Sequence, residues 1–335
     1  MQKPRSRTLF GLILGLIISA LALALAIRWS GWQQLRLALM QVDLRFVLLA
    51  VFVFLLSMMA RAAAWQALLN WQFPYLRVLA VLNEGYFLSN LLPFRLGEIG
   101  RAIILSRSSS GRVISILSSI FTERLYDMVL AVTLLFILFP YAVDLPGAVR
   151  VALILGVILG LVVFGLITLL RKSEFVEAIL RRLPGGLDRW GNFWDQMRSG
   201  FRALEDGKVF SASAFFMLLS WALAGLEYWL VIRAVTADVR LEWAFFMLTV
   251  TLLGGAIPSS PGYIGVFEAA GVLALTVFNV SQADGLAAAI ILHAITFILA
   301  SGFGAIAMIN EGESLTSLYR YLQTWLQENA RGNSA

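Results

Sequence analysis

Long apolar runs constrain the fold of this chain more than any other feature. Of its 335 residues, 60% are hydrophobic and only 14% are charged, and the mean hydropathy is +0.83. A typical soluble domain carries about 45–50% apolar and about 25% charged residues. This composition therefore excludes an ordinary cytosolic enzyme, a disordered protein and a fibrous repeat. A helix needs about 20 apolar residues to cross the ~30 Å hydrocarbon core of a membrane. Runs of that length lie at 8–27, 46–69, 113–139, 148–170, 209–234 and 285–309.

Two further apolar segments, 77–105 and 241–278, are interrupted near their middle. Proline lacks an N–H group and disrupts a helix, while glycine adopts turn conformations that are closed to other residues. The arms, of roughly ten to seventeen residues, are short for a full span, so we expect two re-entrant hairpins. The alternative is that each arm crosses as a short span, which gives ten crossings in all. The breaks contain Pro93 and Gly97 in the first segment, and Pro258, Pro261, Gly262 and Gly265 in the second.

The distribution of basic residues predicts the topology. Segment 171–208 is the longest hydrophilic stretch and holds eight basic residues against six acidic ones. Cytoplasmic loops collect Lys and Arg, so we place this loop and both termini in the cytoplasm, with 28–45 and 140–150 outside. The hairpin at 77–105 then enters from the cytoplasm and the hairpin at 241–278 from outside. Interrupted segments in two inverted halves indicate the binding site of a transporter.

The predicted fold is an all-α integral membrane protein of the cell membrane. It is a polytopic helix bundle with about six full spans and two Pro/Gly-broken re-entrant hairpins in an inverted repeat. The run at 8–27 reads as an uncleaved first span because no small-residue cleavage site follows it. Residues 1–310 form the membrane domain, with an amphipathic cytoplasmic loop at 171–208, and 311–335 form an amphipathic cytoplasmic tail. The inverted halves are 46–139 and 209–309.

Three charged residues lie almost at the centre of the run 113–139, namely Glu123, Arg124 and Asp127. A charge at mid-membrane costs about 2.5–3.5 kcal/mol, so a helix with three such charges should not present them to lipid. Arg124 lies about 100° around the helix from Glu123, which predicts that its partner lies on another element. We expect that partner to be Glu98. A buried ion network of purely structural role is the alternative, since buried ion pairs often add little stability.

The interrupted segments predict a cavity. Broken helix ends at membrane depth are tolerated only where they are buried in protein or line a water-filled cavity, and helix N-termini bind phosphate. We expect Arg124 to face a cavity lined by Pro93 and Pro258. Arginines would hold phosphate there, while carboxylates would balance charge or bind an amine, and Arg95 and Arg101 would meet Glu123 and Asp127. The predicted substrate-binding set is Asn90, Pro93, Arg95, Gly97, Glu98, Arg101, Glu123, Arg124, Asp127, Pro258, Pro261, Gly262, Gly265 and Glu268.

Two other polar residues within the apolar runs are assigned structural roles. Arg61 is expected to extend its side chain to the cytoplasmic interface. His293 is the only histidine, and the chain has no cysteine. A metal site would therefore lack ligands, and we expect His293 to make a structural hydrogen bond rather than to act as a proton relay.

The residue inventory argues against several chemistries. Without cysteine, thiolate catalysis and disulfides are excluded, and one histidine makes a His-based triad improbable. The sequence contains no Walker-type loop, and we expect no cofactor and no metal. The net charge of +6 is read as a topology signal rather than as a sign of nucleic acid binding.

Three sequence segments together resemble one family. They are NLLPFRLGEIGRAIIL (Asn90–Leu105), ERLYD (Glu123–Asp127) and PSSPGYIGVFEAA (Pro258–Ala270). They resemble the signature segments of the lysylphosphatidylglycerol synthase transmembrane-region family, and the resemblance covers about residues 8–310. Some members carry a cytosolic aminoacyltransferase domain that attaches lysine to phosphatidylglycerol, and their membrane region is implicated in flipping the product. The resemblance implies a stand-alone member without that domain.

We therefore expect a flippase-like transporter rather than an enzyme, with a phospholipid or a polyprenyl-phosphate-linked lipid as its partner. Two alternatives from other classes remain open. One is a membrane-embedded lipid-modifying enzyme that uses Glu98, Glu123 or Asp127 as acid or base. The other is a scaffold that docks a separate glycosyl- or acyltransferase through 171–208.

Overall fold

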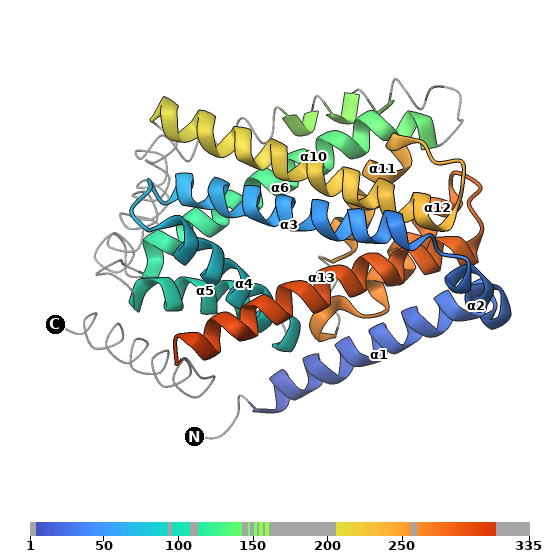
Figure 1. Ribbon diagram of the computed structural model, residues 1–335, viewed down its shortest axis with the longest axis horizontal. Helices are drawn as coiled ribbons and strands as arrows, with labels where there is room; N and C mark the ends of the chain where they lie inside the picture. Colours follow the sequence, from blue (N-terminus) through green and yellow to red (C-terminus); the bar gives the residue numbers. More distant parts are fainter. Residues whose placement is uncertain are drawn as a thin grey trace.

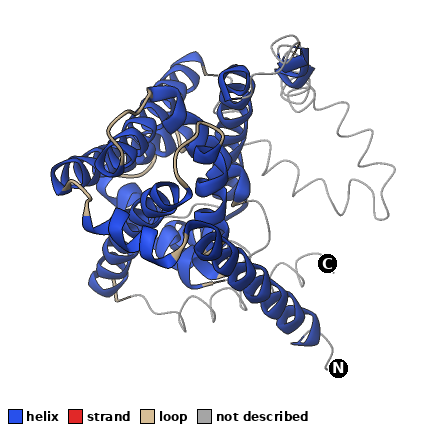
Figure 2. Ribbon diagram, turned by 90° about the vertical axis from the view of Figure 1, so that its right-hand side faces the viewer, coloured by secondary structure: helices blue, strands red, loops and turns tan. Residues whose placement is uncertain are grey.

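The computed structural model describes residues 5–92, 96–107, 113–142, 147, 151–152, 154–156, 158–160, 206–255 and 260–312. Over these residues the chain folds into helices and loops without a strand, which confirms the all-α prediction for this part of the chain (Figures 1 and 2). The main helices are α1 (Arg5–Ser30), α2 (Trp32–Met40), α3 (Leu44–Leu68), α4 (Tyr75–Leu91), α5 (Leu96–Arg107), α6 (Val113–Ala142), α10 (Gly207–Val235), α11 (Leu241–Gly254), the short 3₁₀ helix η2 (Pro261–Tyr263), α12 (Val266–Thr276) and α13 (Gln282–Asn310).

Three of these helices are long and apolar enough to cross a membrane, namely α3, α10 and α13. They correspond to the runs predicted at 46–69, 209–234 and 285–309. The helices α1 and α2 are bent by 80° relative to each other at Gly31, and together they count as a fourth candidate span. The run at 113–139 forms the single helix α6. Most of the run at 148–170, the amphipathic loop and the amphipathic tail lie outside the described residues.

The outer faces of the long helices are apolar. Large hydrophobic side chains are exposed there, including Phe52 of α3, Phe215 of α10 and Ile298 of α13. Exposed apolar surface on this scale is rare in a soluble monomer. It is the surface that a membrane protein presents to lipid.

Each interrupted segment folds back on itself as an antiparallel helix pair. The arms α4 and α5 touch so closely that a Cβ on Gly97 would lie 2.2 Å from the carbonyl oxygen of Gly85. In the second pair, Gly271 of α12 lies against Met247 of α11. The breaks fall where the prolines and glycines predict them. Pro93, Arg95 and Pro258 lie outside the described residues.

The helices α3 and α10 pack against each other along their length in opposite directions. The Ser57 hydroxyl donates to the carbonyl oxygen of Ser220 at 3.0 Å. The backbone N–H of Asp43 donates to the carbonyl oxygen of Ala234 at 2.9 Å. Hydroxyl groups of this kind hold helices together where no water competes for them. Figure 1 shows the two helices side by side across the middle of the molecule.

The helix α13 packs against α4, again antiparallel. The Asn90 amide donates to the Ser301 hydroxyl at 2.8 Å, and Gly304 lies against the backbone of Asn83. An ion pair between Arg77 and Glu311 lies at one end of this helix pair. The helix α6 packs against α11.

These contacts give the molecule two distinct ends. We call one the α2 end, because it holds α2, the start of α3, the end of α10 and the start of α13. There the Ser30 hydroxyl donates to the carbonyl oxygen of Gln282 at 3.2 Å. The opposite end holds the starts of α1, α4 and α10 and the end of α13 (Figure 1). The first hairpin opens to this opposite end and the second opens to the α2 end.

Candidate functional site

Six charged side chains from α3, α5 and α6 form one ion network inside the bundle. Three are cationic and three are anionic, so their formal charges cancel. Because burying an isolated charge is costly, such groups are found paired. The network consists of Arg61, Glu98, Arg101, Glu123, Arg124 and Asp127.

The inner part of the network is centred on Glu123, which is fully buried. Its carboxylate accepts from Nε of Arg61 at 3.1 Å and also pairs with the guanidinium of Arg101. The guanidinium of Arg101 lies 3.6 Å from the ring centre of Trp65, in a cation–π contact. The predicted pairing of Arg101 with Glu123 is confirmed.

The outer part of the network is centred on Arg124. Its Nε lies 2.7 Å from a carboxylate oxygen of Glu98, which confirms the predicted partner. It also pairs with Asp127 at 2.9 Å. The expectation that the partner of Arg124 lies only on another element was therefore incomplete. Residues three apart on a helix are neighbours, so the arginine bridges α5 and its own helix.

The prediction that Arg61 reaches out to the membrane interface was wrong. Its side chain turns inward and pairs with both Glu123 and Asp127. The reason is that these two carboxylates share the face of α6 that is directed at α3, where a cation stabilises them more than water at the interface would. Trp221 of α10 adds a hydrogen bond to Asp127 at 3.0 Å.

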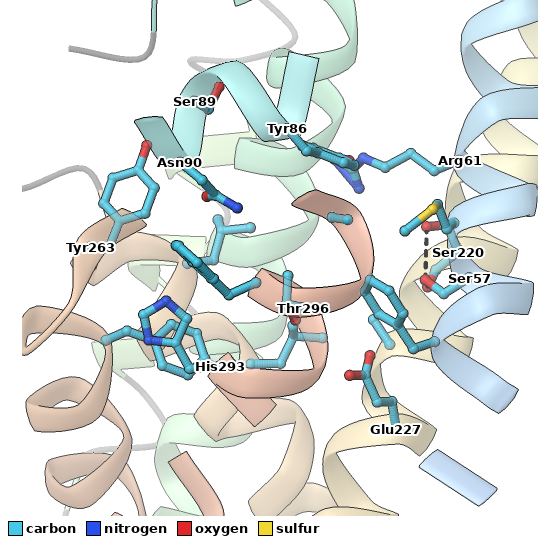
Figure 3. Close-up of a pocket in the computed structure, with 18 of the residues that line it drawn as sticks. Ser57, Arg61, Tyr86, Ser89, Asn90, Ser220, Glu227, Tyr263, His293 and Thr296 are labelled. Atoms are coloured by element: carbon cyan, nitrogen blue, oxygen red, sulfur yellow. Dashed lines mark hydrogen bonds between the residues drawn. The ribbon is translucent and has the colours of Figure 1, made fainter. Parts of the chain in front are cut away.

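A cavity of about 330 Å³ adjoins this network (Figure 3). Its wall is built by α3, α4, α5 and α6 of the first half of the chain and by α10, α11, η2, α12 and α13 of the second half. Small-molecule sites commonly measure about 300–1,000 Å³ and combine apolar walls with a few polar groups. The polar side chains of this wall include Ser57, Arg61, Tyr86, Ser89, Asn90, Glu98, Arg124, Ser220, Glu227, Tyr228, Tyr263, His293 and Thr296.

The predicted site residues divide between the cavity wall and its surroundings. Those that line the cavity are Asn90, Glu98, Arg124 and Gly262. Arg101, Glu123 and Asp127 are buried behind the wall, and Gly97 packs against α4. The remaining described members, Pro261, Gly265 and Glu268, belong to the turn and first helical residues of the second hairpin. The contact of Arg124 with Pro93 and Pro258 falls outside the described residues.

The second hairpin carries its own acid–base pair. One carboxylate oxygen of Glu268 accepts from the backbone N–H of Gly265 at 2.5 Å. The other lies 2.6 Å from Nδ1 of His293, so this histidine makes a hydrogen bond as predicted. Gly265 has a φ of 89°, in the left-handed region that glycine adopts readily. A Cβ there would lie 2.2 Å from the carbonyl oxygen of Ser19 in α1.

Sequence reasoning missed several residues of the cavity wall. Arg61, Glu227 and His293 carry the signal that identified Glu123, because each is an ionisable group within an apolar run. Ser57, Ser220 and Tyr86 carry no such signal. Only the packing of α3, α4 and α10 around the cavity identifies them as wall residues.

An apolar groove of about 470 Å³ adjoins the cavity. It is formed by α3, α4 and α13, and its lining includes Leu55, Leu79 and Phe303. Met58 of α3 lines both the groove and the charged cavity. The linings of the two spaces therefore share one side chain.

Comparison with known proteins identifies the family of this chain. The family model described as "Lysylphosphatidylglycerol synthase TM region" matches residues 12–304. The chain belongs to this family. It is 23% identical over 235 residues to a UPF0104 membrane protein of Methanocaldococcus jannaschii, covering 66% of this chain and 92% of the relative. It is 26% identical over 148 residues to a UPF0104 membrane protein of Pyrococcus horikoshii, covering 42% of this chain and 44% of the relative. The chain is an integral membrane protein of this family.

Proposed function

We propose that this protein moves a phosphate-bearing lipid between the two leaflets of the cell membrane. The observation that carries the proposal is the charged cavity, which has guanidinium groups on its wall and adjoins an apolar groove. A lipid has a charged headgroup and apolar chains, and these two spaces offer matching surroundings for both parts. The family description names a lipid synthase, and this supports a lipid as the transported molecule.

The headgroup phosphate would bind Arg61 and Arg124, the two arginines on the cavity wall. Guanidinium groups bind phosphate through paired hydrogen bonds. Arg124 is shared between Glu98 and Asp127, so a phosphate can replace Glu98 while Asp127 keeps its place. Glu98 would then be free to bind an amine of the headgroup.

The proposed layout has about six full spans and two re-entrant hairpins. A rise of 1.5 Å per residue gives α4 and α5 lengths of about 25 and 18 Å, and α11 and α12 lengths of about 21 and 16 Å. These lengths are short of the ~30 Å hydrocarbon core. Because the hairpins open to opposite ends of the molecule, their tips would meet inside the membrane.

Matching contacts support an inverted repeat of the two halves. The first helices, α3 and α10, pair with each other, and α4 packs on α13 as α11 packs on α6. Glu98 and Glu268 each occupy the third position of the helix that follows a break. Each pairs with a basic side chain of the next long helix, Arg124 in one half and His293 in the other. We place the end opposite to the α2 end in the cytoplasm, with both termini.

Transport in reconstituted vesicles tests this proposal. Purified protein in liposomes should move fluorescent phosphatidylglycerol or a labelled polyprenyl phosphate to the leaflet where an added quencher reaches it. Loss of a charge-assisted hydrogen bond costs about 1.5–3 kcal/mol, and 1.4 kcal/mol is a factor of ten. R124Q should therefore lower the rate by about tenfold or more, and E98Q should do the same when the labelled lipid carries a headgroup amine.

The matched control is R240Q, because Arg240 is 70% exposed and pairs with Glu242 away from the cavity. It should leave the transport rate unchanged. Full transport by folded R124Q and E98Q proteins would reject the cavity as the lipid path. A chemically altered lipid after incubation would favour an enzyme instead.

A further inference from the structure

Glu227 differs from the other carboxyl group on the cavity wall. Glu98 is paired with Arg124, whereas no ion pair or hydrogen bond from a described residue reaches the carboxyl of Glu227. The residue is only 3% exposed, and its Oε1 is buried without a partner. It nevertheless belongs to the lining of the cavity and lies on α10, eight residues before this helix ends at Val235.

The neighbouring helices supply no free cation to Glu227. Among the described residues, α3, α11 and α13 pack against α10, and α6 reaches α10 through the hydrogen bond between Trp221 and Asp127. From these helices, the charged or titratable groups on the cavity wall are Arg61, Arg124 and His293, and α11 contributes only apolar side chains there. Each is already paired: Arg61 with Glu123 and Asp127, Arg124 with Glu98 and Asp127, and His293 with Glu268. The adjacent Tyr228 shares a hydrogen bond of 3.1 Å with Thr251.

Figure 3 shows how these groups are arranged. In that view the carboxyl of Glu227 points into the space below the hydrogen-bonded pair Ser57 and Ser220, and Arg61 lies above that pair. The cavity wall therefore has a cationic part and a separate carboxyl. This carboxyl is not needed to neutralise the arginines, whose charges are already balanced by the network.

The physical consequence is that this burial favours the neutral, protonated form of Glu227. A buried carboxylate without a partner costs several kcal/mol, and a neutral carboxyl group avoids most of that cost. Water that enters the cavity would hydrate the carboxylate and lower the free-energy cost of the charged form. Ionisable residues inside a membrane protein mark ion pathways and proton relays.

We propose that Glu227 is a proton-binding site that couples lipid movement to proton movement. On the open side, the O–H bond of the carboxyl breaks, the electron pair stays on the carboxylate, and the proton passes to cavity water. On the other side a proton from water restores the neutral group. The coupling rests on the proposed transport function, while the proton site itself does not.

Infrared difference spectroscopy of the purified full-length protein tests the proton site. A pH step should change a carbonyl band of a protonated carboxylic acid in the wild type, and E227Q should lose that band. E227D should restore a shifted band, which separates proton binding from misfolding of one variant. The control E242Q removes a carboxyl that is paired with Arg240, and it should keep the band. An unchanged band in E227Q overturns the proposal.

Vesicles with an imposed pH gradient test the coupling. The wild type should move labelled lipid faster with the gradient than without it, and E227Q should lose this response while E242Q keeps it. An equal response in E227Q, or a response to a sodium gradient alone, overturns the coupling. Vesicles in which the wild type moves no lipid at all contradict the transport function, and the infrared result then still decides whether Glu227 binds a proton.

Discussion

At the scale of single residues, the ion network behaves as one unit. Glu123 is shared by two arginines, and Asp127 by Arg61 and Arg124. Removal of one member leaves its partners buried without full compensation, and this typically costs about 3–5 kcal/mol. A side chain can therefore be essential to folding whether or not it touches a substrate, so stability and transport must be measured separately.

Arg61 offers the sharpest stability prediction. R61M should destabilise the protein by about 3–5 kcal/mol, because Asp127 and Glu123 lose their shared cation. The measurement is the free energy of unfolding in detergent, with R45Q as a control, since Arg45 is exposed. The double variant R61M/D127N should recover part of the lost unfolding free energy, because it also removes the negative charge of Asp127 that R61M leaves without its partner. Equal stabilities of R61M and R45Q would contradict this account of the network.

The free-energy cost of a buried charge correctly predicted that Glu98 pairs with Arg124. The direction predicted for the side chain of Arg61 was wrong. Glu98 was identifiable because few carboxylates occur in the neighbouring apolar segments. Arg61 lies seven residues before the end of α3 at Leu68, which is about 10 Å along a helix. A long side chain can reach the interface from there, so depth alone did not decide its direction. The position of α6 decides it, and the sequence of α3 contains no information on that position.

At the scale of elements, glycine decides how closely α13 and α4 approach. A Cβ on Gly304 would lie 2.2 Å from the carbonyl oxygen of Asn83, whereas a Cβ on Gly302 would meet nothing within 4 Å. The two glycines are two residues apart in one apolar run, and sequence pattern alone does not distinguish them. The breaks of the hairpins, by contrast, were predictable because proline and glycine cluster there. The bend at Gly31 between α1 and α2 was not predicted.

These two glycines form a matched pair of variants. Replacing glycine by alanine stabilises a helix by up to about 1 kcal/mol at either site. At Gly304, however, the added methyl group must also push the α4 backbone away. G304A should lower the midpoint of thermal unfolding in detergent, while G302A should leave it unchanged or raise it. Similar midpoints for the two variants would show that α4 and α13 are not held at this distance.

At the scale of the whole molecule, the described loops gather at two ends. Gln33 in α2 and Asp238 between α10 and α11 lie at the α2 end, while Gln72 between α3 and α4 and Lys208 at the start of α10 lie at the opposite end. All four side chains are exposed. The distribution of basic residues predicts which of these ends faces the cytoplasm, because the positive-inside rule acts on loops rather than on packing. What it could not supply is how the halves pack around the cavity.

Because the chain has no cysteine, single-cysteine variants report their side of the membrane without background. Q33C and D238C should react with a membrane-impermeant thiol reagent added to intact cells. Q72C and K208C should react only after the membrane is opened. Leu91, at the end of α4 and 46% exposed, distinguishes the two layouts. In a re-entrant hairpin it lies within the hydrocarbon core, and L91C should react slowly from either side. If each arm crosses the membrane, the break lies outside, and L91C should react in intact cells as fast as Q33C.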